Sequence, residues 1–230
     1  MSKLIYVADD EKNIRNLIQS FLKKEGYTVC AFETGDALFE SFEQTPCDLV
    51  ILDVMMPGNS GFIICTKLRA ISNVPIIMLT ARDTDDDYIS GLSLGSDDYF
   101  TKPFSPVKLI MRVKALFRRI EMDTESAPKQ NGEINYANVT INQENHTAFC
   151  QGQEIALTGT EFNLLVYLFE NHHRAVSREE LLSNIWGYDS EVESRATDDT
   201  VKRLRRKLVD TNVLIDTVWG FGFRIKELVE

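Results

Sequence analysis

Residues 49–61 read LVILDVMMPGNSG, and this stretch decides how the first half of the chain folds. A run of four apolar residues, followed by a segment that holds Pro57 and Gly58, is typical of a short strand buried on both faces of a parallel sheet. The carboxylate of Asp53 follows the run directly. Comparable runs occur elsewhere in this half, and we expect strands at Leu4–Ala8, Thr28–Phe32, Leu49–Leu52, Ile76–Leu79 and Tyr99–Phe100.

Helical patterns separate these runs. The first pattern has apolar residues at i, i+3, i+4, i+7 and i+8 and ends at Gly26. Its apolar residues are Ile14, Leu17, Ile18, Phe21 and Leu22. A similar pattern over residues 109–117 closes the region. Strands that alternate with helices in this way predict an α/β fold over residues 1–120, a doubly wound, five-stranded parallel sheet. The functional crevice of such a sheet lies at the carboxyl ends of its strands.

A change of pattern marks a second domain. Residues 121–133 contain almost no apolar side chains and are expected to form a linker. Short β-like pieces then precede three amphipathic helices, and the chain closes with a β-hairpin over residues 214–225. The third helix carries Val201, Leu204 and Leu208 at the spacing of one face. This order of elements predicts an α+β winged helix-turn-helix domain over residues 134–230.

The net charge of −10 argues against DNA binding, because contacts to phosphate need basic residues. Five basic residues nevertheless fall within the six positions 202–207, and a concentrated basic stripe can dominate the local field. No stretch approaches the roughly 18 apolar residues of a membrane span, so no membrane contact is expected. The four cysteines form no CxxC pair, which is typical of reduced thiols in a cytoplasmic protein.

Carboxylates stand at the ends of two predicted strands. Asp9 and Asp10 follow the first strand and Asp53 follows the third, and the strand order of a doubly wound sheet places these two ends close together. Clustered carboxylates repel one another unless a cation joins them, and Mg²⁺ is the usual hard cation. Thr80 and Lys102, at the ends of the fourth and fifth strands, add a hydroxyl and an ammonium group that can hold phosphoryl oxygens.

On these residues, the first 120 positions resemble the response-regulator receiver family. The matching motifs are Asp9-Asp10, LDVMMPGNSG around Asp53, Thr80-Ala81, Asp98-Tyr99 and Lys102-Pro103-Phe104. The resemblance implies that a sensor histidine kinase phosphorylates Asp53. It implies that Asp10, Asp53 and the Met55 carbonyl ligate Mg²⁺, with Asp9 acting through water. It further implies that Thr80 and Tyr99 form a switch pair and that the Lys102–Pro103 peptide is cis.

The same resemblance implies that phosphorylation drives a homodimer through the fourth helix, the fifth strand and the fifth helix. The residues expected at this interface are Ile89, Leu92, Asp98, Met111 and Arg112. Asp98 and Arg112 would pair across the two-fold axis. The family usually has a further ion pair between its fourth and fifth helices. This chain has Tyr88 and Lys108 there, so we expect a weak dimer in which a cation–π contact replaces part of that ion pair.

Residues 134–228 resemble the effector domain of the OmpR/PhoB subfamily. Matching motifs include Ser177-Arg178-Glu179, Ile185-Trp186-Gly187-Tyr188, Arg203-Leu204-Arg205 and Gly220-Phe221-Gly222-Phe223. Members are transcription factors that bind direct repeats, so double-stranded promoter DNA is the expected partner and RNA polymerase a further candidate.

Positions along the third helix of this domain divide into two expected roles. We expect Asp199, Thr200 and Arg203 to contact base edges, and we expect the phosphate contacts at Lys202, Arg205 and Arg206. Asp199 has a second interpretation, as a helix-start carboxylate that only complements the helix dipole. In the closing hairpin, Trp219 stands where the family often has an arginine that enters the minor groove.

Alternative functions explain fewer of these features. A dinucleotide-binding domain needs G-x-G-x-x-G after its first strand, where this chain reads ADDEK. A phosphatase of the haloacid dehalogenase type would have a second Asp two residues after its nucleophile, where this chain has Met55. An enzyme is therefore not expected. The remaining alternative is a constitutive, architectural DNA-binding protein, against which the intact Asp10, Asp53, Thr80 and Lys102 argue.

Overall fold

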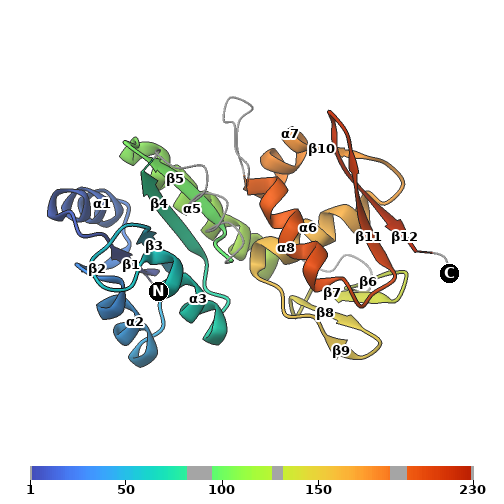
Figure 1. The fold of residues 1–230 in the computed structure, drawn as a ribbon, viewed down its shortest axis with the longest axis horizontal. Coiled ribbons are helices and arrows are strands. Elements are labelled where there is room, and N and C mark those ends of the chain that lie inside the picture. Colours follow the sequence, from blue (N-terminus) through green and yellow to red (C-terminus); the bar gives the residue numbers. More distant parts are fainter. Residues whose placement is uncertain (1, 82–94, 126–131, 187–195, 229–230) are drawn as a thin grey trace. The chain divides into compact units, whose positions relative to one another are not determined.

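The computed structural model describes residues 2–81, 95–125, 132–186 and 196–228, without the side chains of residues 81 and 119–125. The chain divides into two compact units, Met1–Lys114 and Ala115–Glu230, which share no sheet among the described residues (Figure 1). None of the described helices is both long and apolar enough to cross a membrane.

A five-stranded parallel sheet forms the first unit, in the order β2-β1-β3-β4-β5. The strands are β1 (Leu4–Ala8), β2 (Thr28–Phe32), β3 (Leu49–Asp53), β4 (Ile76–Ala81) and β5 (Asp98–Lys102). Residues 49–52 are completely buried, as a strand covered on both faces requires. The predicted sheet is therefore confirmed, with β3, β4 and β5 longer than their apolar runs.

Helices cover both faces of this sheet. Figure 1 shows α1 (Lys12–Lys24) and α5 (Pro106–Glu125) on one face, and α2 (Gly35–Gln44) and α3 (Gly61–Ile71) on the other. On α1, Ile18 and Leu22 are buried, whereas Leu17 is 41% exposed and does not face the core as its spacing suggested. The helix expected between β4 and β5 lies outside the described residues.

Helix α5 runs further than its apolar pattern. It continues to Glu125, so residues 121–125, which were expected in the linker, are helical. A helix needs no apolar side chain to propagate once it has started, because each added residue gains a backbone hydrogen bond. The polar composition of this stretch therefore does not locate the end of the helix.

Two small sheets and a group of helices form the second unit. The first sheet is antiparallel, in the order β6 (Glu133–Tyr136), β7 (Val139–Asn142), β8 (Thr147–Cys150) and β9 (Gln153–Glu154). Helix α6 (Gly159–Glu170) follows, and then β10 (Val176–Ser177) leads into α7 (Arg178–Leu181), which continues as a π-helical segment, Leu182–Trp186. Helix α8 (Ala196–Lys207) precedes the hairpin of β11 (Val213–Val218) and β12 (Gly222–Glu227). The second sheet has the order β10-β12-β11.

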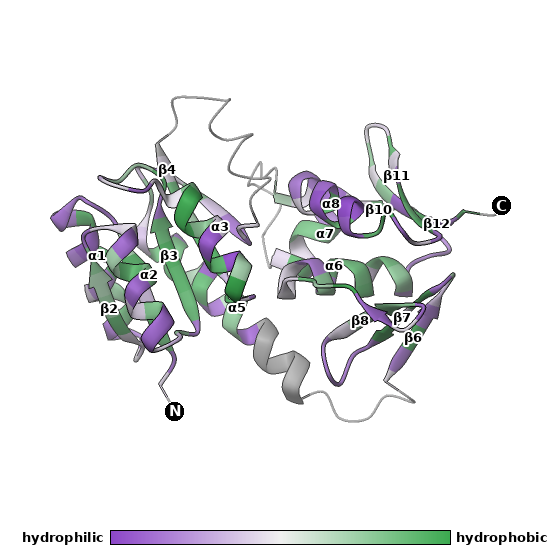
Figure 2. Ribbon diagram, turned by 60° about the horizontal axis from the view of Figure 1, so that its bottom comes forward, coloured by the Kyte–Doolittle hydropathy of each residue, from purple (hydrophilic) through white to green (hydrophobic). Residues whose placement is uncertain are grey.

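The second core lies among α6, α8 and the hairpin. Val201, Leu204 and Leu208 are buried on α8, as their spacing predicted, and Phe223 and Ile225 are buried on β12. Figure 2 shows the remainder of α8 as strongly hydrophilic, in contrast to the apolar β3 of the first unit. A winged helix-turn-helix is thus confirmed as the fold of the second unit.

Candidate functional sites

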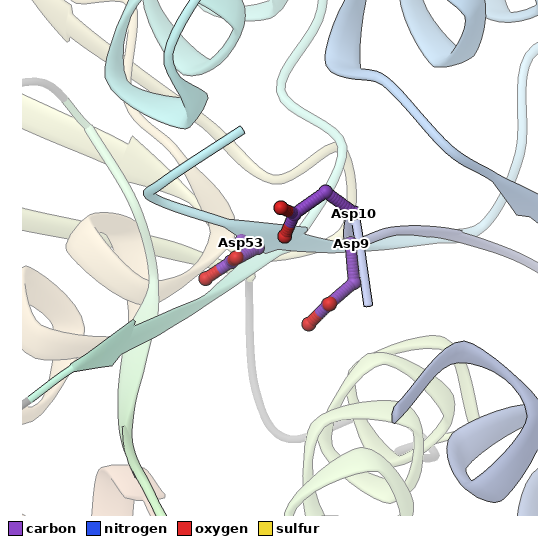
Figure 3. Close-up of side chains that lie close together, drawn as sticks. All are labelled: Asp9, Asp10 and Asp53. Carbon is purple, nitrogen blue, oxygen red and sulfur yellow. The ribbon is translucent and has the colours of Figure 1, made fainter. Parts of the chain in front are cut away.

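The strand order brings three carboxylates together. Because β1 lies beside β3, with Ala8 opposite Leu52, the residues that follow these positions meet at one edge of the sheet. Carboxylate oxygens of Asp9, Asp10 and Asp53 all lie within 4.8 Å of one another, and Figure 3 shows the three side chains grouped there. Asp9 and Asp53 are 0% and 2% exposed, whereas Asp10 is open to solvent.

An ammonium group from the end of β5, at the same edge of the sheet, joins this cluster. The Nζ atom of Lys102 lies 2.8 Å from Oδ2 of Asp9 and 3.0 Å from Oδ2 of Asp53. Glu11 is further away, at 3.6 Å. The Lys102–Pro103 peptide is cis, as the motif implied. Lys102 therefore contacts two buried carboxylates at once.

The electrostatics of the cluster favour an additional cation. Burial raises the pKa of Asp53 to about 6, although Lys102 opposes the shift, and burial also raises the pKa of Asp9. Burial alone would lower the pKa of Lys102, but Asp9 and Asp53 outweigh it and raise that pKa. One ammonium group cannot neutralise three neighbouring carboxylates. An all-oxygen donor set with this excess of negative charge fits a hard divalent cation such as Mg²⁺.

The loop after Asp53 is folded tightly against its neighbours. A Cβ atom on Gly61 would lie 2.0 Å from the carbonyl oxygen of Asp53, so only glycine permits this approach. Asp36 of α2 accepts hydrogen bonds from the backbone and the side-chain amide of Asn59, at 3.2 and 2.6 Å. The Met55 side chain is 64% exposed in this loop. These contacts fix the backbone that carries the Met55 carbonyl.

Arg15 is a residue of this site that the sequence reasoning missed. Its Nη1 donates to the carbonyl oxygens of Asp9 and Asp10, at 2.7 and 2.8 Å. The guanidinium therefore orients the backbone of both acidic residues without touching their carboxylates. Its only sequence signal is a basic residue within the first two turns after the acidic pair.

The two switch candidates lie on adjacent strands. Thr80 is 7% exposed and stands one residue beyond Leu79, which is the partner of Asp53 in the sheet. Tyr99 on β5 is half-buried and lies opposite Met78. The hydroxyl of Thr80 is thus at the same sheet edge as Asp53.

One expected intersubunit contact is formed within a single chain. The Nη1 atom of Arg112 lies 2.9 Å from Oδ2 of Asp98, and both side chains are largely buried. The two groups therefore already pair between β5 and α5 of one chain, and their pairing across a two-fold axis stays a prediction. Met111 is 63% exposed, as an interface residue requires. Ile89 and Leu92, like Tyr88, lie outside the described residues.

On α8 the structure corrects two expected base contacts. Arg203 and Thr200 are 5% and 1% exposed and cannot reach a DNA base in this structure. The Nε atom of Arg203 donates to Oε1 of Glu161 at 3.1 Å, and its Nη2 donates to the Thr200 hydroxyl at 3.1 Å. Glu161 also contacts Lys207 at 2.6 Å and completes a capping box with Thr158 at the start of α6. The buried carboxylate attracts Arg203 into the core.

The outer face of α8 is smaller than expected. Lys202 and Arg206 are exposed, consistent with phosphate contacts. Arg205 is half-buried and donates from Nε to the carbonyl of Ile215 and from Nη2 to the hydroxyl of Thr217, both at 2.8 Å. Asp199 is half-buried in the first turn.

Comparison with known proteins identifies both units. Residues 5–114 match the family described as Response regulator receiver domain, and residues 152–225 match Transcriptional regulatory protein, C terminal. The chain is 40% identical to Regulatory protein VanR of Enterococcus faecium over 231 residues, which cover 99% of this chain and 100% of the relative. This chain belongs to the OmpR/PhoB family of two-component response regulators.

Other relatives of this response regulator agree. It is 39% identical to the transcriptional regulatory protein YclJ of Bacillus subtilis over 97% of its length and 99% of the relative. Among solved structures, a RitR mutant superposes with a TM-score of 0.76 at 27% identity, covering 98% of this chain and 100% of that chain. The regulator DrrB of Thermotoga maritima, an OmpR/PhoB homolog, has a TM-score of 0.52 at 31% identity, with 98% and 100% covered.

Proposed function

We propose that Asp53 is the phosphoacceptor of this response regulator and that its donor is the phosphohistidine of a sensor histidine kinase. A carboxylate oxygen of Asp53 forms the new O–P bond, the P–N bond to the donor histidine breaks, and the released imidazole nitrogen takes a proton. The observation that carries this proposal is the buried Asp53 carboxylate at the strand end, 3.0 Å from Lys102 and within 4.8 Å of two further carboxylates.

Mg²⁺ is the cofactor that the donor set fits. Asp10, Asp53 and the Met55 carbonyl would hold it, with Asp9 acting through water. When bound, the cation supplies positive charge that offsets both the carboxylates and the phosphoryl oxygens. Lys102 is then positioned to hold one phosphoryl oxygen and to orient Asp53. The hydroxyl of Thr80 donates to another phosphoryl oxygen and, with Tyr99, reports the modification.

Promoter DNA is the partner of the second unit. Lys202 and Arg206 project from α8 and supply phosphate contacts, while Asp199 in the first turn is the remaining candidate for a base contact. Dimerisation through the receiver brings two such units to adjacent half-sites. The regulator acts in the cytoplasm, where its DNA lies, and RNA polymerase is a further partner of a promoter-bound dimer.

A constitutive DNA-binding protein is the competing function, and one experiment separates the two. Beryllofluoride with Mg²⁺ mimics the phosphoryl group on an aspartate. We expect the full chain treated with both to increase in mass to a dimer and to bind DNA more tightly than the untreated chain. Equal mass and equal DNA affinity with and without the reagent would contradict phosphorylation control. The Asp53→Ala variant, which has no carboxylate to modify, is the control.

A further inference from the structure

Two arginines from different helices meet one aromatic ring of the hairpin. Phe223 on β12 is 2% exposed. The guanidinium carbon of Arg178, the first residue of α7, lies 4.7 Å from the centre of its ring, and that of Arg205 on α8 lies 5.8 Å from it. Both cations are within the range of cation–π attraction. The ring therefore joins both helices of the helix-turn-helix to the hairpin.

Arg205 holds the outer strand of the hairpin. β11 is an edge strand of its sheet, so one row of its backbone groups has no strand partner among the residues that the structure describes. The Nε atom of Arg205 donates to the Ile215 carbonyl on this strand, and its Nη2 donates to the Thr217 hydroxyl. A planar guanidinium can make both bonds at once, whereas a lysine ammonium lacks this fixed fork. These two hydrogen bonds hold the strand in place, so the guanidinium is oriented toward the hairpin and not toward a DNA phosphate.

Arg178 holds the inner strand. Its side chain forms a two-point ion pair with Asp198 in the first turn of α8, with Nε and Nη2 at 2.9 and 2.8 Å from the carboxylate oxygens. Its backbone N–H donates to the carbonyl of Phe221 at 3.2 Å. The strand pairing beside it is very close, since a Cβ atom on Gly222 would lie 2.0 Å from the carbonyl oxygen of Val176. α7, α8 and β12 are thus tied together at one residue.

We infer that Arg205 and Arg178 are positioning residues, which fix the hairpin to α7 and α8 and thereby set where its tip stands when α8 binds DNA. This inference rests on the proposed DNA binding by α8. It replaces the phosphate contact expected of Arg205, because two of that residue's donor nitrogens already bond to the hairpin. The tip is the exposed segment around Trp219, which is 94% exposed.

The hairpin tip carries its own reporter. The chain has two tryptophans, and the other, Trp186, is 2% exposed in the core. A collisional quencher in water therefore acts mainly on Trp219. Fluorescence quenching with and without DNA measures whether the tip is held against the duplex, independently of the overall affinity.

The first part of the test uses the full-length protein without DNA. Amide hydrogen exchange is compared in the wild type, Arg205→Lys, Arg178→Lys and the control Arg206→Lys. We expect exchange in residues 213–227 to accelerate by about tenfold in the first two variants, because charge-assisted hydrogen bonds are lost. Exchange in β6–β8 should stay unchanged. Unchanged exchange in the hairpin of Arg205→Lys would overturn the inference, whatever α8 does on DNA.

The second part uses DNA, with a duplex selected from a random pool by the beryllofluoride-treated protein and a scrambled duplex of equal composition. Arg205→Lys retains the positive charge, so a phosphate contact predicts near wild-type binding and protection of Trp219. The positioning role predicts that Arg205→Lys loses preference for the selected duplex and leaves Trp219 open to quencher. Arg205→Ala should keep the wild-type salt dependence, whereas a lost phosphate contact lowers that slope by about 0.9.

Arg206→Ala tests the proposed DNA face separately. We expect its slope to fall by about 0.9 on both duplexes, since it loses a phosphate contact. If the slope of Arg206→Ala is unchanged, the assignment of α8 as the DNA-binding helix is wrong, while the exchange measurement still decides whether Arg205 positions the hairpin. If instead Arg205→Ala alone shows the reduced slope, Arg205 contacts phosphate and the inference fails.

Discussion

Asp53 is a residue whose surroundings oppose its charge. Burial raises its pKa to about 6, and the Lys102 ammonium group, which lies 3.0 Å away, keeps the charged form accessible. A carboxylate that is desolvated but paired reacts with an electrophilic phosphorus without first shedding a water shell. The same residue therefore combines a stability penalty with nucleophilic character, as functional sites often do.

Replacing Asp53 by Asn tests this role. The amide keeps the shape but removes the nucleophilic charge, so Asp53→Asn should incorporate no phosphate from acetyl phosphate in the presence of Mg²⁺. Intact-protein mass spectrometry measures the incorporation. Asp10→Asn is a useful companion, because it retains the acceptor and should be modified more slowly rather than not at all. Stoichiometric labelling of Asp53→Asn would refute the assignment.

Glu161 is the corresponding buried charge of the second unit. Burial would raise its pKa, but Lys207 and Arg203 outweigh burial and hold the pKa below its ordinary value of 4.5. A carboxylate with a depressed folded-state pKa stabilises the fold above the unfolded pKa, and that stabilisation is lost as the pH falls through the folded value. The second unit should therefore lose stability in acid.

Glu161→Gln removes this charge and leaves the buried Arg203 without its anion. We expect it to lower the free energy of unfolding of the second unit by roughly 3–5 kcal/mol at neutral pH. The difference from wild type should shrink as the pH falls below 4.5, because protonated Glu161 resembles Gln. Urea unfolding, monitored by hydrogen exchange in the second unit, measures the free energy of unfolding of both proteins at neutral and at acidic pH. The surface residue Asp216 supplies the control, and Asp216→Asn should change stability much less. A pH-independent difference would contradict the ion-pair explanation.

At the scale of elements, the sequence predicts strands and helices well where burial alone shapes them. β1 has the expected bounds because its apolar run matches a strand buried on both faces, and the edge strand β2 has them although only Val29 of its residues is buried. α8 shows where this reasoning stops. Arg203 lies three residues after Thr200 and seven after Ala196, so it belongs to a second, buried stripe of the helix. The sequence alone places this charged residue on the DNA-facing side of the helix, because its partner, Glu161, is 42 positions away in the sequence.

The same limit applies to Arg205, whose partners Ile215 and Thr217 lie on the hairpin. Each contact joins residues whose proximity depends on the tertiary fold, and sequence spacing carries no information about it. The carboxylate cluster could be predicted because parallel strands end at a common edge. Motifs that follow from topology are therefore accessible from the sequence, whereas side-chain partners across elements are not.

Gly222 tests the close pairing of β10 and β12. Gly222→Ala would place a methyl group 2.0 Å from the Val176 carbonyl oxygen, which forces the strands apart. We expect a loss of roughly 1–3 kcal/mol in the stability of the second unit, together with weaker DNA binding. The control is Gly159→Ala at the start of α6, where a Cβ atom meets nothing within 4 Å. That variant should be neutral or slightly stabilising. Equal thermal midpoints for the two variants would show that the close approach of β10 and β12 does not contribute to the stability of the second unit.

In the whole molecule, association of two chains through α5 would link phosphorylation of the first unit to DNA binding by the second. α5 presents Val107 and Met111, four residues apart on one face, at 57% and 63% exposure. Asp98 and Arg112 already pair within one chain, so an exchange for the same pair between chains would add little net energy. The association should therefore depend on the apolar patch and be weak.

Met111→Glu examines this dependence directly. A two-fold interface contains each substitution twice, so two buried carboxylates would face the apolar patch and oppose association. In sedimentation velocity with beryllofluoride and Mg²⁺, the wild type should dimerise at tens of micromolar, which corresponds to about 6 kcal/mol of association energy. Met111→Glu should stay monomeric at that concentration.

Val209→Glu is the matched control, because Val209 is an apolar residue of the second unit that is 74% exposed. This substitution should leave the dimer intact. A Met111→Glu protein that dimerises like the wild type would exclude the α5 face as the interface. Loss of the dimer in both variants would instead indicate that the second unit takes part in association.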